Sequence, residues 1–368
     1  MSYNDIKHIL PVFMFQGRVV NVDEMTSGNI NSTYHLVCRK TDGSLIEYTL
    51  QKINHYVFKD PASVMRNIDL VTKHLQGRYR REGLDHSRRT LEIVPKRTGE
   101  SMYGNDEIGY WRAYYYIGNV NVYDRIEKEE HFREVGRAFG RFQKYLHDFP
   151  ADQLTETIPG FHNTLKRFYA FVAAVDADQA GRVAELESEI DFFFDRRRMM
   201  GEIVKRMADG AIPLRVTHND TKINNVMIDN ETDEAVCVID LDTVMPGSSL
   251  YDFGDAIRSG ASTADEDEED LSKVTLDMVR YKLFTQGFLA ETNGFLETDE
   301  IRLLPLGAKV ITCELAMRFL TDYINGDLYF KVNSPDHNLI RARAQMKLLT
   351  DIERKFDQMQ EEIEKMVN

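Results

Sequence analysis

The spacing of apolar residues changes near residue 120, and this change limits the fold more than any other feature of the chain. Before residue 120, apolar and polar residues alternate in short stretches separated by turn-forming segments, the pattern of strands that bury one face. The expected strands are 18–23, 33–38, 45–53, 91–95 and 110–117. Because short turns join the first three, they predict an antiparallel meander. A helix is expected over residues 62–75, where apolar residues recur at helical spacing.

After residue 120 the apolar spacing becomes that of helices. Apolar residues lie on one face of a predicted helix over residues 127–147. Gly136 and Gly140 on this helix indicate close packing against another helix in a protein core. Helices continue to the end of the chain, apart from an insert of strands between Leu214 and Asp242.

Near the C-terminus, apolar residues recur at alternating spacings of three and four from Leu349 to Met366. This spacing predicts one amphipathic helix that docks on its own domain, with self-association as the alternative, so we expect a monomer or a weak homodimer. The change of pattern along the chain predicts an α+β protein with two parts. These are a strand-rich domain over residues 1–117 and a larger helical domain over residues 118–368.

The charge of the chain indicates which partners to expect. The sequence has 46 Lys and Arg against 60 Asp and Glu, so its formal charge is −14. Nucleic acids and anionic membranes recruit basic surfaces, so we expect neither as a partner. The acidic run 265–270 is expected to be a solvated loop or the start of a helix.

The location of the protein is inferred from three features of its sequence. No run of 18 apolar residues exists, and charged residues and a proline interrupt the first 18 residues, which therefore lack a signal-peptide core. The three cysteines lie far apart, and Cys38 and Cys237 each lie in an apolar run, as buried hydrophobic residues do. We therefore expect a cytoplasmic protein.

The most informative segment is the insert of strands, because polar groups lie at both ends of a predicted hairpin. Asp220 and Asn225 precede its first apolar run, and Asp240 closes the second. Phosphoryl transfer needs one carboxylate to accept the proton of the attacking hydroxyl and oxygen ligands for the Mg²⁺ of ATP. Asp220 suits the first role, and Asn225 and Asp240 suit the second. Lys222 can reach the transferring phosphoryl group as a point charge. Taken alone, an Asp or Asn before a strand is usually a turn former, so the prediction rests on the residues together.

The same residues carry a resemblance to a known family. The chain resembles the aminoglycoside phosphotransferase-like and choline kinase-like small-molecule kinases, whose signature His-x-Asp-x-x-x-x-Asn and strand-ending Asp are matched by His218, Asp220, Asn225 and Asp240. Within the family it is most similar to N-acetylhexosamine 1-kinases, on the segments 48–54, 65–68, 217–222, 239–247 and 251–259. The resemblance implies the two-lobed protein-kinase-like fold, with a small antiparallel-sheet lobe and a larger helical lobe. It also implies ATP and Mg²⁺ as cofactors, Asp220 and Lys222 as catalytic residues, and Asn225 and Asp240 as metal ligands.

The resemblance further assigns residues to the nucleotide. The predicted nucleotide contacts are Gly28, Asn31, Ser32, Lys52, Tyr115 and Ile117. Two features depart from protein kinases. The helix after Lys52 offers only Asp69 where a glutamate is expected, and Asp252-Phe253-Gly254 lies too far from Asp220, without a preceding strand, to be the metal motif. We expect Asp252 and Asp255 to cap and brace a helix.

On the acceptor side, the resemblance implies an N-acetylhexosamine phosphorylated at its anomeric hydroxyl. His162, Arg318 and Tyr329 are the predicted sugar contacts. Arg318 lies on an apolar helix face and needs a partner, which is either the sugar or Asp322, one turn later. The alternatives are another small alcohol, such as choline, ethanolamine, an aminoglycoside or another sugar, and a kinase-like binding module without activity. The module would be expected to lack Asp220, Asn225 or Asp240, and all three are present.

Overall fold

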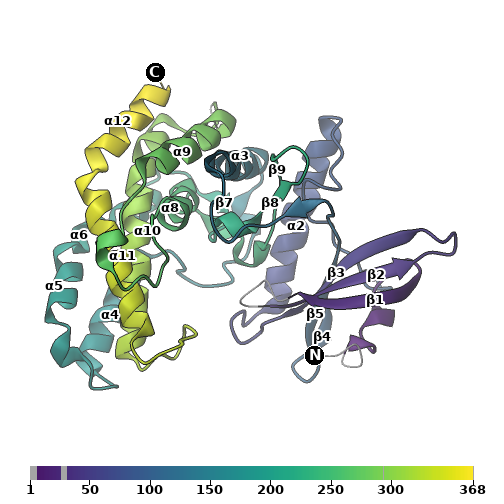
Figure 1. Cartoon of the computed structure of the whole chain (residues 1–368), viewed down its shortest axis with the longest axis horizontal. Helices are drawn as coiled ribbons and strands as arrows, with labels where there is room; N and C mark the ends of the chain where they lie inside the picture. The colour runs from purple at the N-terminus through teal and green to yellow at the C-terminus, as the bar shows by residue number, and fades with distance from the viewer. Residues whose placement is uncertain (1–5, 26–30, 293, 368) are drawn as a thin grey trace. The chain divides into compact units, whose positions relative to one another are not determined.

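The computed structural model describes residues 6–25, 31–292 and 294–367 (Figure 1). The chain divides into two compact units, each built from discontinuous segments. The first unit contains Met1–Asn121, Asp152–Ile158 and Met227–Met245. The second unit contains Val122–Ala151, Pro159–Val226 and Pro246–Asn368. The domain boundary after residue 117 stays a prediction.

The first unit is built on an antiparallel sheet. Its strands are β1 (Arg18–Met25), β2 (Ser32–Arg39), β3 (Leu45–Ile53), β4 (Tyr103–Asn105) and β5 (Gly109–Tyr115). They lie in the order β1-β2-β3-β5-β4, and each neighbouring pair is antiparallel. The predicted meander and the strand at 110–117 are therefore confirmed. Alternating residues of β2 and β3 enter one core, which includes Leu36, Cys38, Tyr48 and Leu50.

The prediction of a strand over residues 91–95 is wrong. Ile93 forms only an isolated bridge with Tyr114, although the N–H of Val94 donates to the carbonyl of Ala113 at 2.8 Å. Pro95 has no N–H to donate, so the ladder beside β5 does not continue through this residue. The regular partner on this edge of β5 is the short strand β4, which the sequence did not predict.

One long helix and a second small sheet complete the first unit, together with the short helix η1 (Leu10–Val12). The helix, α2 (Pro61–Arg81), begins at Asp60, whose carboxylate accepts a hydrogen bond from the N–H of Ser63 at 3.1 Å. Val64, Ile68 and Val71 form its buried face, as the helical spacing predicted. The small sheet has the order β6-β8-β9, with β6 (Val120–Asn121), β8 (Val226–Asp229) and β9 (Ala235–Val238).

The second unit is mainly helical. Its helices are α3 (Glu129–Leu146), α4 (Thr164–Ala177), α5 (Glu187–Asp195), α6 (Arg197–Met200), α7 (Glu202–Ala208), α8 (Ser249–Gly260), α9 (Met278–Thr292), α10 (Thr298–Ile324), α11 (His337–Arg354) and α12 (Phe356–Val367). The remaining short elements of the chain are η2 (Ala151–Gln153), η3 (Val183–Glu185), η4 (Ile223–Asn225), η5 (Leu241–Thr243), η6 (Leu271–Lys273), β7 (Arg215–Thr217) and β10 (Met245–Gly247). The close packing predicted from two glycines is confirmed, because Cβ atoms at Gly136 and Gly140 would collide with the backbone of Phe284 and Phe288 on α9.

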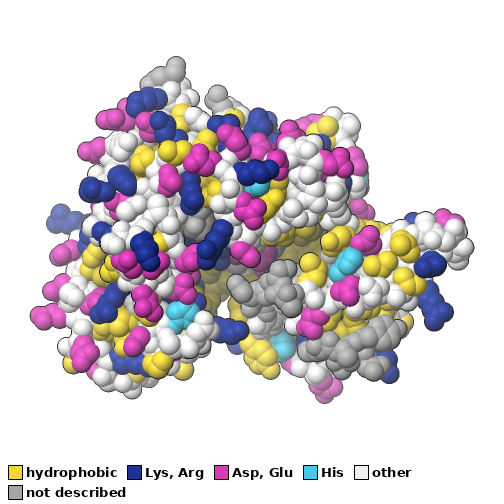
Figure 2. Space-filling view, viewed as in Figure 1, with side chains coloured by type: hydrophobic (Ala, Val, Ile, Leu, Met, Phe, Trp, Pro, Cys, Tyr) yellow, Lys and Arg dark blue, Asp and Glu magenta, His cyan; other side chains and the backbone are white. Residues whose placement is uncertain are grey.

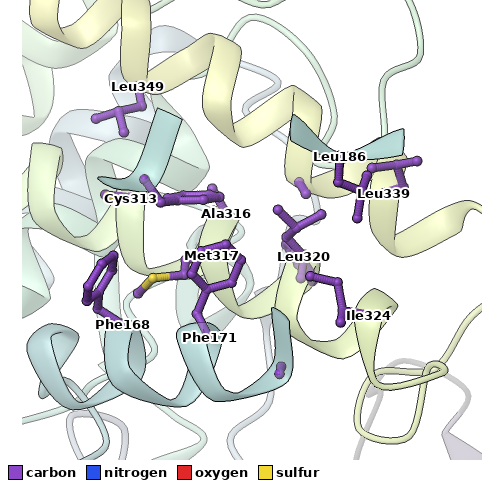
Figure 3. Packing of buried hydrophobic residues seen from close by; sticks show 14 of the residues in the cluster. Phe168, Phe171, Leu186, Cys313, Ala316, Met317, Leu320, Ile324, Leu339 and Leu349 are labelled. Atoms are coloured by element: carbon purple, nitrogen blue, oxygen red, sulfur yellow. The ribbon is translucent and has the colours of Figure 1, made fainter. Parts of the chain in front are cut away.

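The main core of the second unit lies around α10. Figure 3 shows Phe168 and Phe171 of α4 packed against Met317 of α10, with Leu320 and Ile324 further along α10. These side chains are at most 2% exposed. Full burial of a side chain of this size contributes about 1.5–3 kcal/mol. This core fixes α10, the helix that carries the predicted sugar contact Arg318.

The prediction of one helix from Leu349 to Met366 is corrected, because the structure has two helices, α11 and α12, separated at Lys355. The Lys355 side chain turns to Asp351, at 2.7 Å, and to the carbonyl of Leu276, at 2.6 Å. Apolar spacing alone cannot reveal such a break, since it continues across it. The predicted docking is confirmed: Met359 is buried, and its carbonyl accepts a hydrogen bond from the Tyr281 hydroxyl at 3.1 Å.

Two further predictions concern burial. Cys38, Cys237 and Cys313 are free thiols, and all three are buried, as predicted for the first two. No helix within residues 6–25, 31–292 and 294–367 is long and apolar enough to cross a lipid bilayer.

Candidate active site

The loop between β7 and β8 brings together three of the predicted site residues. The ammonium of Lys222 lies 2.7 Å from Oδ1 of Asp220. The amide of Asn225 donates to Oδ2 of Asp220 at 3.1 Å and to its carbonyl at 2.8 Å. Both bonds use Nδ2, so the oxygen of the Asn225 amide is the atom able to coordinate a cation. One carboxylate is thus positioned from both sides by its own loop.

The surroundings of Asp220 keep its carboxylate ionised. Burial raises the pKa of Asp220, but the charge and hydrogen bond of Lys222, together with His218 and Asn225, hold it below its usual range. Asp220 in turn raises the pKa of Lys222, so the two groups form a charged pair at neutral pH. A carboxylate held in this state can accept a proton.

The backbone of this loop is fixed by two carboxylates of α8. Asp252 accepts hydrogen bonds from the N–H groups of His218, at 2.9 Å, and Asn219, at 2.8 Å. Asp255 accepts one from the N–H of Thr221 at 2.9 Å. The expectation that Asp252 and Asp255 cap a helix is therefore corrected, because they lie within α8 and brace the loop that carries Asp220. Asp252 thus lies in a helix, not at the end of a strand.

Two residues with left-handed backbone conformation mark the predicted catalytic segments. Asn219, directly before Asp220, has φ of 65°, and Asp240 has φ of 57°. Non-glycine residues adopt this region only at a cost, and such residues cluster at functional sites. The N–H groups of His218 and Asn219 both donate to Asp252 of α8, and these hydrogen bonds help to hold Asn219 in this conformation.

Several carboxylates of the acidic run 265–270 lie close to basic side chains of other segments. Asp265 is 2.6 Å from Arg125, Glu266 is 3.0 Å from Arg258, Asp267 is 3.1 Å from His337, and Glu268 is 3.3 Å from Lys273. Arg258 also binds Asp255, which connects the run to the loop that carries Asp220. Acidic and basic side chains are interspersed on the visible surface (Figure 2). Asp265, Glu266 and Glu268 of the run thus each have an Arg or Lys partner.

The predicted metal ligand Asp240 lies in the first unit, two residues after β9, at the start of η5. The turn that follows it is anchored through Asp242. Both oxygens of Asp242 accept hydrogen bonds from the Arg112 guanidinium, and the amide of Asn31 donates to Oδ2 at 2.6 Å. The sequence did not predict the role of Arg112.

The predicted phosphate contacts of the first unit lie together at one end of the β2–β3 pair. The strand register places Ser32 directly opposite Lys52. Asn31 accepts a hydrogen bond from the N–H of Asn54 at 2.9 Å, just beyond β3. The Lys52 ammonium lies 5.7 Å from the centre of the Trp111 ring, whereas Asp69 pairs with Lys73 at 2.6 Å. Gly28, which was also predicted, lies outside the described residues.

The predicted adenine contacts lie at the end of β5. Tyr115 is its last residue, and its N–H donates to the carbonyl of Glu92 at 2.9 Å. Ile117 follows two residues later and is 4% exposed. The N–H of Tyr115 is thus engaged within the protein, and adenine contacts by these two residues stay predictions.

The predicted acceptor residues lie in one cluster of the second unit. The Arg318 guanidinium faces the rings of Phe161 at 5.4 Å and Tyr329 at 5.6 Å. Nδ1 of His162 hydrogen-bonds to Glu314, one turn before Arg318, at 2.9 Å. Nε2 of His162 is buried and has no hydrogen-bond partner among the described residues. A buried ring nitrogen without a partner costs free energy, which a hydrogen bond from a bound ligand would recover.

The alternative in which Asp322 is the partner of Arg318 is wrong. Within the described part of the chain, Asp322 instead accepts hydrogen bonds from three successive N–H groups of the following loop, those of residues 328, 329 and 330, at 3.0, 2.8 and 2.9 Å. These bonds hold Tyr329 in place while its side chain remains 60% exposed. Asp322 therefore orders the loop that presents Tyr329.

Sequence reasoning missed two charged members of this cluster. Glu314 is 1% exposed; burial raises its pKa, but His162, Arg318 and a hydrogen bond from Thr164 hold it below its usual range. Burial and the neighbouring Arg318 lower the pKa of Arg167, which donates to the carbonyl of Phe161 at 3.1 Å. The spacing of four residues between Glu314 and Arg318 was the available signal for Glu314.

Comparison with protein-family models shows which family the chain belongs to. A family model described as the phosphotransferase enzyme family matches residues 24–276. The match covers more than half of the 368 residues, so the protein belongs to this family of phosphotransferases. The resemblance inferred from the His218, Asp220, Asn225 and Asp240 pattern is confirmed at this level.

Solved structures of related fold are small-molecule kinases. A microcompartment-associated aminopropanol kinase has a TM-score of 0.57 at 11% identity, with 97% of this chain and 98% of that chain covered. Spectinomycin phosphotransferase, solved with ADP and spectinomycin, has a TM-score of 0.58 at 13% identity, covering 97% and 99%. Choline kinase from Cryptosporidium parvum Iowa II has a TM-score of 0.55 at 12% identity, covering 94% and 92%. At these identities the comparison shows the fold, and it confirms the protein-kinase-like architecture.

Proposed function

We propose that this phosphotransferase transfers the γ-phosphoryl group of ATP to a hydroxyl group of an N-acetylhexosamine, with Asp220 as the general base. The observation that carries the chemical part is the arrangement at Asp220. Its carboxylate is kept ionised between Lys222 and Asn225, on a loop whose backbone is fixed by α8. A fixed, ionised carboxylate in a kinase-like fold suits acceptance of a hydroxyl proton.

The chemistry asks the protein mainly to position groups and to neutralise charge. Asp220 accepts the proton as the acceptor oxygen bonds to phosphorus and the bond to the leaving oxygen of ADP breaks. Lys222 offers an ammonium for charge on the transferring phosphoryl group. Lys52, with Asn31 and Ser32 beside it, is assigned to the phosphates that remain on the nucleotide.

A divalent cation would be held by Asp240 and by the amide oxygen of Asn225. No group of three or more His, Cys, Asp or Glu side chains able to hold a metal ion occurs within the described residues. That does not conflict with the assignment, because Mg²⁺ is commonly bound by one or two protein oxygens together with waters and substrate phosphates. When bound, the cation would neutralise phosphate charge.

An N-acetylhexosamine suits the cluster around Arg318. Sugars offer hydroxyl and acetamido groups for hydrogen bonds and apolar faces for aromatic rings, and the cluster offers both. Because ionised Glu314 can only accept, Nδ1 of His162 donates to it, which leaves the buried Nε2 of the ring to form a hydrogen bond with a polar group of the sugar. We assign phosphorylation to the anomeric hydroxyl, on the sequence likeness alone, so the product is the sugar 1-phosphate.

The charge of the same cluster weighs against a cationic acceptor. Arg167 and Arg318 are positive and Glu314 is negative, so these three side chains sum to +1. An ammonium group would be repelled here, and the acidic run already has its own cationic partners. Amino alcohols and aminoglycosides are therefore the second candidate class, supported by the substrates named for the kinases of similar fold.

One assay separates these candidates. ATP consumption is measured with N-acetylglucosamine, N-acetylgalactosamine, glucose, galactose, choline, ethanolamine and an aminoglycoside. We expect turnover with the N-acetylhexosamines, and a ³¹P signal of the product that couples to the anomeric proton. Coupling to a methylene pair would assign a 6-phosphate and end the 1-kinase proposal. Turnover with amines alone would end the sugar proposal, and turnover with none would favour a binding module.

A further inference from the structure

Among the described residues of the first unit, the ion pair between Arg112 and Asp242 is buried as deeply as the hydrophobic core. Arg112 lies in the middle of β5, and Asp242 lies on η5, two residues after the predicted metal ligand Asp240. Both side chains are 2% exposed. Nη1 of Arg112 binds Oδ1 of Asp242, and Nη2 donates to Oδ2 at 3.1 Å, so the pair is bidentate.

The pair also joins the two segments assigned to the phosphates. Nε of Arg112 donates to Oε1 of Gln51 at 2.9 Å, and Gln51 is the residue before Lys52 on β3. The amide of Asn31, next to Ser32, donates to Oδ2 of Asp242 at 2.6 Å. The turn after Asp240 is therefore tied to β5, to β3 beside Lys52 and to the start of β2.

Stability alone gives no reason for this arrangement. Removing two charges from water costs several kcal/mol per ion, and apolar residues of similar volume often serve a fold equally well. Both oxygens of Asp242 are occupied by Arg112 and Asn31, so Asp242 is an anchor rather than a further ligand for a cation. The residue it anchors, Asp240, has the left-handed φ of 57°, a conformation that persists only where the surroundings enforce it.

We propose that Arg112 is a positioning residue: through Asp242 it holds Asp240 in its ligand conformation and so sets the Mg²⁺ dependence of nucleotide binding. The inference rests on the proposed function, because it takes Asp240 as the residue that holds the cation of ATP.

The test is Mg²⁺-dependent binding of AMP-PNP, followed by calorimetry, together with the free energy of unfolding. Arg112→Met is expected to raise the Mg²⁺ concentration for half-maximal binding by about tenfold or more, and to destabilise the protein, because it leaves a buried carboxylate unpaired. Arg112→Lys keeps the charge but loses the bidentate geometry, so an intermediate shift is expected. The double variant Arg112→Met/Asp242→Leu removes the unpaired charge. It should recover stability, but its Mg²⁺ midpoint, the Mg²⁺ concentration for half-maximal binding, should stay raised.

The matched control is Arg196→Met, which breaks another bidentate pair, Arg196–Glu353, with bonds of 3.1 and 2.7 Å in the second unit. It should lose stability and keep the Mg²⁺ midpoint. A wild-type midpoint in Arg112→Lys and in the double variant would overturn the inference and leave the pair a structural one. If Arg112→Met does not fold, the concentrations of Mg²⁺ for half-maximal binding measured in Arg112→Lys and in the double variant test the inference. Absence of Mg²⁺-dependent AMP-PNP binding in the wild type would overturn the proposed function itself, and with it this inference.

Discussion

The ammonium of Lys222 lies 2.7 Å from Oδ1 of Asp220, and the two groups hold each other in their charged forms. The second carboxylate oxygen of Asp220 accepts from Asn225. A general base for phosphoryl transfer must be ionised when the acceptor hydroxyl arrives, and this contact provides that condition. Among the side chains that lower the pKa of Asp220, Lys222 has the largest effect.

Replacing Lys222 should shift the acid limb of the dependence of kcat/KM on pH. Burial raises the pKa of Asp220 and Lys222 lowers it, so Lys222→Met should raise that pKa. Asp220 then becomes protonated at higher pH, and the acid limb of kcat/KM should shift to higher pH. Lys222→Arg keeps the positive charge and is the matched control, with a limb close to that of the wild type. An unmoved limb in Lys222→Met would show that Lys222 does not set the ionisation of Asp220.

Changing the metal ligand should alter the cation requirement. Asp240→Asn removes the negative charge that we assign to the cation, so the concentration of Mg²⁺ needed for half-maximal activity should rise. Excess Mg²⁺ or Mn²⁺ should restore part of the lost turnover, which is measured by titrating each metal at saturating ATP. If the metal titration of Asp240→Asn matches that of the wild type, Asp240 does not hold the cation.

Removing the Arg318 side chain should weaken sugar binding and leave ATP binding nearly unchanged. Charge-assisted hydrogen bonds contribute roughly 1.5–3 kcal/mol, so Arg318→Ala should raise the sugar KM about tenfold or more and leave the ATP KM nearly unchanged. Arg341 provides a control, because it faces the Phe319 ring at 5.4 Å outside the cluster. Arg341→Ala should keep both KM values. A sugar KM unchanged in Arg318→Ala, with a lower melting temperature, would make Arg318 a structural residue.

The sequence predicted the parts of the fold that depend on local spacing. Alternation identified β1, β2 and β3, and helical spacing identified α2 and α3, because each element buries one face. Apolar spacing gave wrong predictions where a single residue ends a strand or a helix. Pro95 limits the ladder beside β5, and Lys355 separates α11 from α12, although the apolar spacing continues across both helices.

The candidate site divides in the same way. Asp220, Lys222 and Asn225 lie within six residues, so their spacing alone indicated that they meet. Arg112 and Asp242 are separated by 130 positions, and although Asp242 lies in the recognised segment 239–247, nothing in the sequence indicates Arg112 as its partner, so only the fold reveals their contact. The pairing of Asp322 with the N–H groups of its own loop is equally invisible in sequence, where proximity to Arg318 suggested an ion pair.

The most direct test of the account is the turnover number of Asp220→Asn with saturating ATP, Mg²⁺ and N-acetylhexosamine. Asparagine keeps the shape of the side chain and one of its two acceptor atoms, but it cannot accept the proton. A positioned base contributes about 10²-fold or more, so kcat should fall by at least that factor. The KM values for sugar and ATP should stay near those of the wild type, and no concentration of Mg²⁺ or Mn²⁺ should restore turnover. Near-normal turnover in Asp220→Asn would contradict the assignment of Asp220 as the base.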